Sequence, residues 1–500
     1  MKKLIIIKRC SQTLFLLLFV YILWSTTHPL RGLLPPETFF RINPLIIIFT
    51  SISERLLLPG IGLSLLMLLL TGVFGRFFCG FVCPLGTTID AVGVLRKNTP
   101  VASDKANRKL RKPKFFILGA IAVFAILGTQ IAWIFDPMVI MARFVSLNLI
   151  PTTTLVLDKL FVALIRNFEL YGPVYDFYRS MKSSFLGIDP YYFSNSSIIF
   201  YVFLIVTFAA LFLKRAWCRM ICPLGALYAL AARFSVLRRT IEKCTTCGMC
   251  KSRCRMGAIK DDMSYIKGEC ILCMDCVYDC PSRITKFNWP NTKKKDKNGP
   301  EGGISRRNFL VFAFSSLFLP GLKVYVAGPK TVTGKTGIIR PPGASKEERL
   351  LSRCIRCGNC MKVCITNGLQ PVMFESGFEG MWTPRLIPEI GYCEYNCTLC
   401  GNVCPTGAIP RLPLAEKKRT KLGIARVDRG TCLAWEYKTD CIVCEEHCPV
   451  PEKAIKLEAE IVNGRELLKP VVDRTLCIGC GICQNKCPQR PVRSIRVYQA

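Results

Sequence analysis

Histidine is almost absent from this sequence of 500 residues, which contains only His28 and His447. No Cys-x-x-Cys-His motif occurs either. Haem held by paired histidines and covalently attached c-type haem are therefore both disfavoured. The sequence also lacks a Walker A loop and a Gly-x-Gly-x-x-Gly loop after a strand, so neither nucleotide nor nicotinamide chemistry is indicated.

Acidic residues are scarce, because 34 Asp and Glu stand against 68 Lys and Arg, giving a net charge of +34. Such an excess can indicate nucleic-acid binding, but here the basic residues flank apolar spans, and no nucleic-acid partner is predicted. Hydrophobic residues make up 51% of the chain, and the mean hydropathy is +0.32. Both values exceed those of an ordinary soluble protein. Part of the chain is therefore expected to lie in a membrane.

Apolar spans of bilayer length occupy the first part of the chain. Basic clusters precede the first span, separate the second from the third and follow the fourth, so all of them fall on one side of an even-numbered bundle. This pattern predicts a four-helix membrane domain over 1–240, with the basic ends in the cytoplasm and 136–195 as an external loop. The predicted spans are about 11–27, 56–75, 115–134 and 196–213.

The four predicted helices form two hairpins, and both hairpins end in the same motif. The motif is Cys79-x-x-x-Cys83-Pro in the first and Cys218-x-x-x-Cys222-Pro in the second. Positions i and i+4 share one helical face, and proline suits the first turn of a following helix. Cys83 and Cys222 are therefore predicted to cap helix N-termini, where their thiolates should be stabilised. Packed as pseudo-equivalents, the hairpins would bring the four cysteines together as a membrane redox site able to hold a further metal or cluster. The alternatives are packed free thiols or a redox disulfide within each pair.

Apart from Cys10, interpreted as a small buried hydrophobe, the remaining cysteines form six runs with the spacing of bacterial ferredoxins. In that pattern three cysteines of a run bind one 4Fe-4S cluster, and the fourth reaches the partner cluster. Zinc can be held by four cysteines at similar spacing, but tandem repetition favours iron-sulfur clusters. Six clusters are predicted, and each ligand set is named after its first cysteine. The sets are Cys244, Cys247, Cys250 and Cys280; Cys270, Cys273, Cys276 and Cys254; Cys354, Cys357, Cys360 and Cys404; Cys393, Cys397, Cys400 and Cys364; Cys432, Cys441, Cys444 and Cys487; and Cys477, Cys480, Cys483 and Cys448.

Two runs depart from the regular spacing. One extra residue separates Cys393 from Cys397, and eight residues lie between Cys432 and Cys441. These insertions lengthen loops without removing a ligand. His447 lies inside one run, where it is interpreted as a hydrogen-bonding group and not as a ligand.

The cysteine runs also divide the chain into domains. The first two runs predict a cytoplasmic two-cluster ferredoxin over 241–290, and the other four predict a periplasmic four-cluster module over 329–500. Between them, 291–328 combines a basic linker with a twin-arginine motif at 305–310 and an apolar run, which is either a cleaved signal or a fifth anchor helix. The predicted fold is a membrane α-helical bundle, of four helices plus this signal or anchor helix, with α+β ferredoxin modules that each hold two 4Fe-4S clusters.

The two parts of the sequence resemble two known families of partner proteins. Residues 1–290 resemble the membrane ferredoxins NapH and MauN, through Gly75-Arg76-Phe77-Phe78-Cys79 and Cys222-Pro223-Leu224-Gly225-Ala226-Leu227-Tyr228. Residues 304–500 resemble their partners NapG and MauM, through the twin-arginine start and Arg340-Pro341-Pro342-Gly343-Ala344. The chain thus resembles a fusion of the two partners.

The resemblance implies a quinol dehydrogenase of the bacterial inner membrane, of the type found in periplasmic nitrate reductase systems. Its partners would be the membrane quinone pool and a periplasmic reductase or cytochrome. An enzyme that oxidises quinol also needs a proton acceptor near the membrane interface. The candidates are His28, Glu37, Glu54, Asp90 and Asp136. The alternative function is that of CcoG, a metal reductase or oxidase maturation factor with a similar arrangement.

One step is left open by the sequence. Electrons would have to cross a hydrocarbon core of roughly 30 Å, and no haem ligands are available inside it. Three alternatives follow. Either quinol donates electrons to the external module separately, or the membrane cysteines and a partner subunit carry electrons across the membrane, or the second module stays in the cytoplasm.

Overall fold

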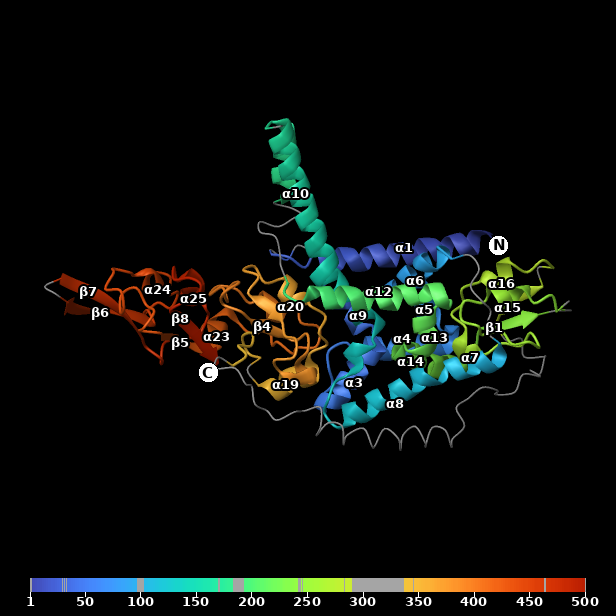
Figure 1. Cartoon of the computed structure of the whole chain (residues 1–500). Helices are drawn as coiled ribbons and strands as arrows, with labels where there is room; N and C mark the ends of the chain where they lie inside the picture. Colours follow the sequence, from blue (N-terminus) through green and yellow to red (C-terminus); the bar gives the residue numbers. More distant parts are fainter. Residues whose placement is uncertain are drawn as a thin grey trace. The chain divides into compact units, whose positions relative to one another are not determined.

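The computed structural model describes residues 2–28, 30, 32, 34–96, 103–169, 171–182, 193–241, 244, 246–282, 284–289, 337–344, 346–462 and 465–499. The described residues form two compact units. Their helices and strands are labelled in Figure 1. The first unit contains the described residues within 1–23, 34–145 and 197–323, and the second contains those within 24–33, 146–196 and 324–500. The predicted first ferredoxin therefore shares a unit with the two hairpins. The linker and the twin-arginine segment lie outside the described residues.

Each predicted span contains a helix, but most of these helices are shorter than predicted. α4 has 14 residues and begins after Gly60, whose φ is +100°, while α12 has 17 residues. α8 ends two residues before Gly128, whose φ is +79°. Within the described part of the chain, α1 is the one of these four that is long and apolar enough to cross a membrane. The four-helix membrane bundle therefore stays a prediction. The helices are α1 (Lys2–Trp24), α4 (Ile61–Phe74), α8 (Lys112–Ile126) and α12 (Ser196–Phe212).

The segment predicted as an external loop folds largely into helices. Pro137–Phe168 is the second stretch of the described chain with the length and apolarity of a membrane span. Pro137 and Pro173 stand in first helical turns, where proline is favoured. Ile165 of α10 and Tyr178 of α11 form the core between those two helices. The elements are α9 (Pro137–Phe144), the π-helical turn η2 (Val145–Leu149), α10 (Ile150–Phe168) and α11 (Pro173–Met181).

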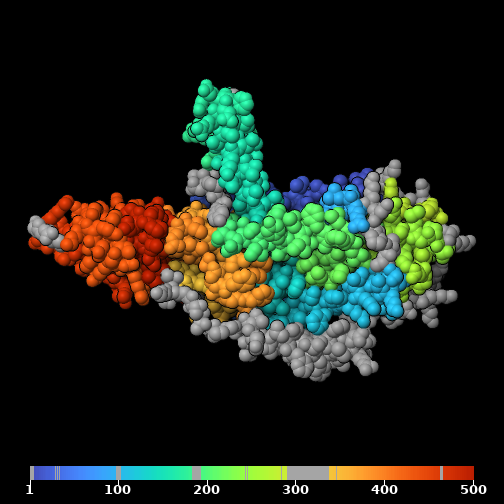
Figure 2. All heavy atoms as spheres, in the orientation of Figure 1, coloured from blue at the N-terminus to red at the C-terminus, as the bar shows by residue number. Residues whose placement is uncertain are grey.

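Both hairpins continue into a short helix, a Cys-Pro turn and a second helix. The first follows α4 and the second follows α12, and α14 packs against α8 and α4. One face of α12 lies on the surface of this unit (Figure 2) and carries the exposed apolar side chains Tyr201, Ile205 and Phe212. The hairpin helices are α5 (Phe77–Phe81), α6 (Pro84–Val94), α13 (Ala216–Met220) and α14 (Pro223–Ala231); the others are α2 (Thr38–Arg41), α3 (Pro44–Glu54) and α7 (Asp104–Leu110), with 3-10 turns at Ala132–Ile134 and Ala232–Phe234.

The first ferredoxin has the predicted α+β character. Strand β1 (Arg238–Ile241) precedes its first cysteine run, and strand β2 (Thr285–Asn288) follows its second. They pair antiparallel, from Arg238↔Asn288 to Ile241↔Thr285. Between them lie α15 (Met249–Arg253), the 3-10 turn η5 (Lys267–Glu269) and α16 (Asp275–Tyr278).

The C-terminal module repeats this plan. β5 (Gly423–Val427) and β8 (Ile495–Gln499) flank the last two runs and pair antiparallel, as β1 and β2 do. Two antiparallel hairpins, β3 (Leu369–Pro371) with β4 (Pro384–Leu386) and β6 (Ile455–Val462) with β7 (Arg465–Val472), each separate two cysteine runs. The helices are short: α19 (Glu347–Arg353), α20 (Asn359–Lys362), α21 (Gly377–Gly380), α22 (Leu399–Asn402), α23 (Leu414–Arg419), α24 (Val443–Glu446) and α25 (Ile482–Lys486).

Candidate metal centres

The cysteines of the first ferredoxin surround two cavities. Each cavity is lined by three cysteines of one run and by the fourth cysteine of the other run, which is the crossing that the spacing predicts. Apolar side chains such as Met263 and Phe287 complete the walls. The first cavity is lined by Cys244, Cys247, Cys250 and Cys280, and the second by Cys270, Cys273, Cys276 and Cys254.

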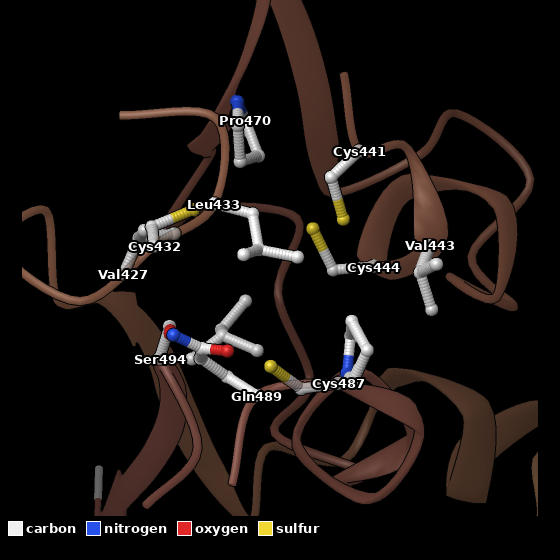
Figure 3. Close-up of a pocket in the computed structure, with 12 residues that line it drawn as sticks. Val427, Cys432, Leu433, Cys441, Val443, Cys444, Pro470, Cys487, Gln489 and Ser494 are labelled. Atoms are coloured by element: carbon white, nitrogen blue, oxygen red, sulfur yellow. The ribbon is translucent and has the colours of Figure 1, made fainter. Parts of the chain in front are cut away.

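The two irregular runs of the C-terminal module are built in the same way. Cys393, Cys397 and Cys400 share a cavity with Cys364. In the Cys432 set, the four sulfur atoms point toward one space, with Leu433, Val443 and Pro470 around it (Figure 3). The longer spacers therefore leave both sets together. The second cavity is lined by Cys432, Cys441, Cys444 and Cys487.

The two remaining sets also converge. Cys354 packs with Cys360 and Cys404 in one core cluster. Burial raises the pKa of Cys360, and Cys357, Cys354 and Cys404 act in the same direction. In the last set, burial raises the pKa of Cys480 to about 12, and Cys477 and Cys448 act in the same direction. Burial likewise raises the pKa of Cys483, which Cys480 and Cys477 raise further.

The backbone at the regular runs fits an anionic group. In four runs, the residues directly before and after the second cysteine both have positive φ. Alternation of right- and left-handed conformations turns successive N–H groups into one concavity, as at many iron-sulfur sites. Backbone N–H groups also donate to ligand sulfurs, for example Ala258 to Cys254 Sγ at 3.2 Å. The donor sets therefore fit iron-sulfur clusters. The residue pairs are Thr246 and Gly248, Leu272 and Met274, Arg356 and Gly358, and Gly479 and Gly481.

Metal analysis provides a direct test of these sets. Protein purified anaerobically is expected to contain at least about 24 iron ions and as many labile sulfides per chain, on the rule of four irons per cluster. Stoichiometric zinc with little iron would contradict the six predicted clusters.

In the C-terminal module, the four sets follow one another in a row. The pKa of Cys360 is raised first by burial and also by Cys400, which belongs to the Cys393 set. The backbone N–H of Cys393 donates to the carbonyl of Cys480 at 2.8 Å. The pKa of Cys483 is raised by burial and also by Cys444 of the Cys432 set. The order of neighbours is therefore the Cys354, Cys393, Cys477 and Cys432 sets.

Within the second unit, residues of the Cys354 run contact Trp24, Thr26 and Leu147. The ammonium group of Lys362 is fully buried and donates to the carbonyl of Trp24 at 3.1 Å and to that of Thr26 at 2.9 Å. A Cβ atom on Gly358 would lie 2.9 Å from Leu147 Cγ. The first set of the row thus lies next to Trp24, Thr26 and Leu147 of the same unit.

The four cysteines of the paired motif also come together. Cys83 and Cys222 are N-caps whose sulfurs accept hydrogen bonds from Gly86 N at 3.4 Å and Gly225 N at 3.2 Å, which confirms the predicted caps. Burial raises the pKa of Cys222, and Cys218, Cys79 and Cys83 raise it further. We call Cys79, Cys83, Cys218 and Cys222 the four-cysteine site.

The prediction that helix N-termini stabilise these thiolates is wrong, because burial favours the protonated thiol more strongly. Burial raises the pKa of Cys83, although the Gly86 N–H opposes the rise. Removing the charged form from water therefore outweighs the helix terminus. A bound metal would reverse this preference, because metals bind thiolates and displace their protons.

The loop before and after Cys270 packs directly on both hairpins. A Cβ atom on Gly80, between Cys79 and Cys83, would lie 2.2 Å from the carbonyl oxygen of Ile271. On the other hairpin, a Cβ atom on Gly268 would lie 2.6 Å from the carbonyl oxygen of Ala229. The four-cysteine site therefore adjoins the Cys270 set. Burial raises the pKa of Cys276 to about 12, and Cys250 acts in the same direction, which places the Cys244 set next in line.

Two functional candidates were missed by the sequence analysis. Arg76 and Arg215 each stand three residues before the first cysteine of a motif, and this repeated position is the signal that could have identified them. Both guanidinium groups are buried, with 0% and 2% exposure. Arg215 pairs with Asp90 at 2.7 Å, and Arg76 pairs with Glu269 at 3.1 Å.

The candidate proton acceptors differ in their surroundings. Asp136 is completely buried at the N-cap of α9 and accepts from Asn43 Nδ2 at 2.8 Å and from two backbone N–H groups. Arg215 and Arg255 hold the pKa of Asp90 well below its usual range, although burial opposes them. Glu37 pairs with Arg41, and His28 is exposed. Glu54, the last residue of α3, is only partly buried. Asp136 is therefore the candidate that combines full burial with neutral donors.

Two smaller expectations have mixed outcomes. His447 is exposed, and its Nδ1 lies 2.9 Å from the carbonyl oxygen of Val443, which confirms a hydrogen-bonding role. Cys10 is exposed on α1, so its interpretation as a buried residue is wrong.

Comparisons with known proteins agree with iron-sulfur chemistry. Two family models, both described as a 4Fe-4S binding domain, match this chain: Fer4_5 at residues 56–101 and 197–243, and Fer4 at 470–493. The first match covers both hairpins with the four-cysteine site, and the second covers the last cysteine run. No solved structure gave a significant match.

Several curated relatives are ferredoxin-type proteins. The methylamine utilization ferredoxin-type protein MauM of Methylorubrum extorquens is 34% identical over 33% of this chain and 74% of its own length. The ferredoxin-type protein NapG of Escherichia coli K12 is 34% identical over 30% of this chain and 65% of its own length. An uncharacterized protein of Methanocaldococcus jannaschii is 26% identical over 59% of this chain and its own full length. The chain thus contains 4Fe-4S binding domains and is related to electron-transfer ferredoxins.

Proposed function

Because the chain belongs, through about a third of its length, to the family of ferredoxin-type proteins that includes MauM, we propose that it is a membrane-anchored quinol dehydrogenase component. It takes electrons from membrane quinol and relays them through 4Fe-4S clusters toward a periplasmic reductase or cytochrome. Six clusters are proposed at the six ligand sets, and the four-cysteine site is proposed as the group that accepts electrons from quinol.

The observation that carries this proposal is the backbone contact between the four-cysteine site and the Cys270 loop. Gly80 leaves room for the Ile271 carbonyl within the Cys79 to Cys83 turn, so no side chain separates the two sites at that point. Bound clusters would supply one-electron transfer between neighbouring sets. After the four-cysteine site, the clusters of the Cys270 set and then of the Cys244 set would carry the electrons.

Anchoring in the bacterial inner membrane is part of the proposal. α1 and Pro137–Phe168 have the length and apolarity for it, and α12 exposes apolar side chains. The basic clusters of the sequence favour a cytoplasmic first ferredoxin, and the twin-arginine motif favours a periplasmic C-terminal module. Protease access to the C-terminal module in intact and in permeabilised cells tests this placement.

Quinol oxidation releases two protons for every two electrons, so an acceptor beside the quinol must take up the protons one at a time and release each to water before the next. Asp136 is proposed for this step because its carboxylate is buried and is held by Asn43 and backbone donors instead of cations. An ionisable residue in such surroundings is a functional candidate by default. Asp90 is unsuited, because its two arginine partners hold it as a carboxylate.

The proposed function is tested by reducing the purified full-length protein with a quinol analogue and following the cluster EPR signals. We expect the signals of reduced clusters to appear on quinol addition. A maturation factor of the CcoG type, which acts on metal, need not respond to quinol. Clusters that dithionite reduces but quinol leaves oxidised would contradict quinol dehydrogenation.

A further inference from the structure

Arg76 and Arg215 are exchanged between the two hairpins. Arg76 precedes Cys79 on the first hairpin, yet its Nη2 lies 2.8 Å from the position of a Cβ atom on Gly225, in the Cys-Pro turn of the second. Arg215 precedes Cys218 on the second hairpin, yet it donates to the carbonyl of Cys79 at 2.8 Å and lies near Gly86 of the first. Each guanidinium thus reaches the cysteine turn of the opposite hairpin.

The exchanged arginines lie close to the thiols themselves. Arg76 Nη2 is 4.0 Å from Cys79 Sγ, and its Nε has no hydrogen-bond partner. Gly86 and Gly225 donate their backbone N–H groups to Cys83 and Cys222. Buried guanidinium groups therefore sit beside the turns that present all the sulfurs of the four-cysteine site.

The ion pairs around this site leave positive charge uncompensated. Each carboxylate is shared: Glu269 contacts both Arg76 and Lys114, and Asp90 contacts both Arg215 and Arg255. Five cations thus face three carboxylates, leaving two positive charges in excess while the thiols are protonated. Uncompensated buried charge is costly. The cations are Arg76, Lys114, Arg215, Arg255 and Lys8, and the carboxylates are Glu269, Asp90 and Asp275.

A buried hydroxyl next to the site also lacks an acceptor. Tyr228 is 0% exposed, its hydroxyl has no hydrogen-bond partner, and its ring packs on Phe78 with centroids 5.4 Å apart. Phe78 directly precedes Cys79, so the ring of Tyr228 lies beside the cysteine turn of the first hairpin. An unsatisfied buried donor destabilises the fold, and an anionic sulfur group in the site would offset this cost.

We propose that Arg76 and Arg215 are the counter-charges of an anionic iron-sulfur cluster held by Cys79, Cys83, Cys218 and Cys222, each hairpin supplying one guanidinium to the other. A cubane with four thiolate ligands is a dianion in its oxidised form, and the positive charge that this ion-pair network leaves uncompensated would stabilise it. Tyr228 would donate to one of its sulfurs. This inference rests on the redox site of the proposed function.

The arginines would act on the potential of the cluster. Reduction adds negative charge, and nearby cations stabilise the reduced form, so they raise the reduction potential. Arg76 and Arg215 are therefore positioning and charge-compensating residues, and the cysteines are the ligands. Removing a cation should lower the potential, and removing a carboxylate should raise it.

The test uses full-length protein purified anaerobically, with iron analysis and EPR redox titration. The Cys79→Ser/Cys218→Ser variant should lose the iron of one cluster and identify its signal by difference. Arg76→Gln should move the midpoint of that signal to lower potential or lower its occupancy by at least tenfold, and Arg76→Lys should restore most of it. Arg219→Gln is the control, because Arg219 is a buried arginine of the second hairpin whose hydrogen-bond partner is Asn107 and not a carboxylate of this network.

Asp90→Asn provides the opposite sign. It removes negative charge beside Arg215 and should move the same midpoint to higher potential, a shift that misfolding does not produce. The proposal is overturned if the double cysteine variant keeps all its iron, if zinc replaces iron there, or if neither Arg76→Gln nor Asp90→Asn moves the midpoint. A site that titrates as expected but is never reduced by quinol would refute the relay and leave this inference standing.

Discussion

Replacing Cys79 and Cys218 together by serine is expected to abolish quinol-driven reduction of the ferredoxin clusters. One sulfur of each hairpin is removed, so the four-cysteine site can no longer hold its group or hand electrons to the adjoining Cys270 set. Dithionite needs no membrane site and should still reduce all six ferredoxin clusters. The measurement is cluster EPR of the full-length variant, first with a quinol analogue and then with dithionite.

The control for this variant is Cys10→Ser, because Cys10 is an exposed cysteine outside every ligand set. It should retain wild-type reduction by both reagents. Loss of the dithionite response in the double variant would indicate misfolding. Wild-type quinol turnover in the double variant would make the four cysteines structural and would move the search for the quinol site to Asp136, His28 and the helices of 137–181.

Replacing Gly80 by alanine is expected to separate the hairpins from the Cys270 loop. The added methyl group would lie 2.2 Å from the Ile271 carbonyl oxygen, so backbone must move on one side. Overpacking of this kind costs about 1–3 kcal/mol. We expect a lower unfolding temperature and slower quinol-driven reduction of the first ferredoxin, measured by thermal denaturation and by stopped-flow spectroscopy.

Gly93→Ala is the matched control for this change. Gly93 lies in α6 of the same hairpin, and a Cβ atom there meets nothing within 4 Å. Alanine at an unhindered helical position is favourable by up to about 1 kcal/mol, so stability should stay the same or rise. Equal behaviour of the two variants would contradict a tight contact at Gly80.

Local spacing carries most of the information about the cysteine sets. Two-residue spacers hold three thiols on one tight loop, whatever the rest of the fold does, and the structure gathers four of the predicted quartets around one cavity each. Where a spacer is longer, as with the eight residues between Cys432 and Cys441, the extra residues lengthen the loop and both cysteines still line the same cavity. The caps at Cys83 and Cys222 were predictable for the same reason, because a cysteine before a Pro-containing first turn is a local signal.

Helix lengths were less predictable, since hydropathy alone does not say where a helix stops. The second predicted span starts at 56, but α4 begins only after Gly60, whose φ is +100°; the preceding helix α3 ends at Glu54, before Arg55 with φ 55°. Ile165 of α10 and Tyr178 of α11 pack against each other. A search for the periodicity of one helix at a time does not identify such a pair of helices. The prediction of stabilised thiolates failed because burial, which is a tertiary property, outweighs the helix terminus.

The sequence by itself determined the chemistry of this protein: which cysteines form sets, where the paired motifs stand and which ends carry basic charge, because each is set by residues close together in the chain. Only the tertiary structure decided which sets are neighbours, that the Cys270 loop rests on Gly80, and that the two arginines exchange hairpins. The physical reason is distance along the chain. Arg76 meets Gly268 across 192 residues and Arg215 meets Asp90 across 125, and no local pattern encodes such a contact before the packing brings the segments together.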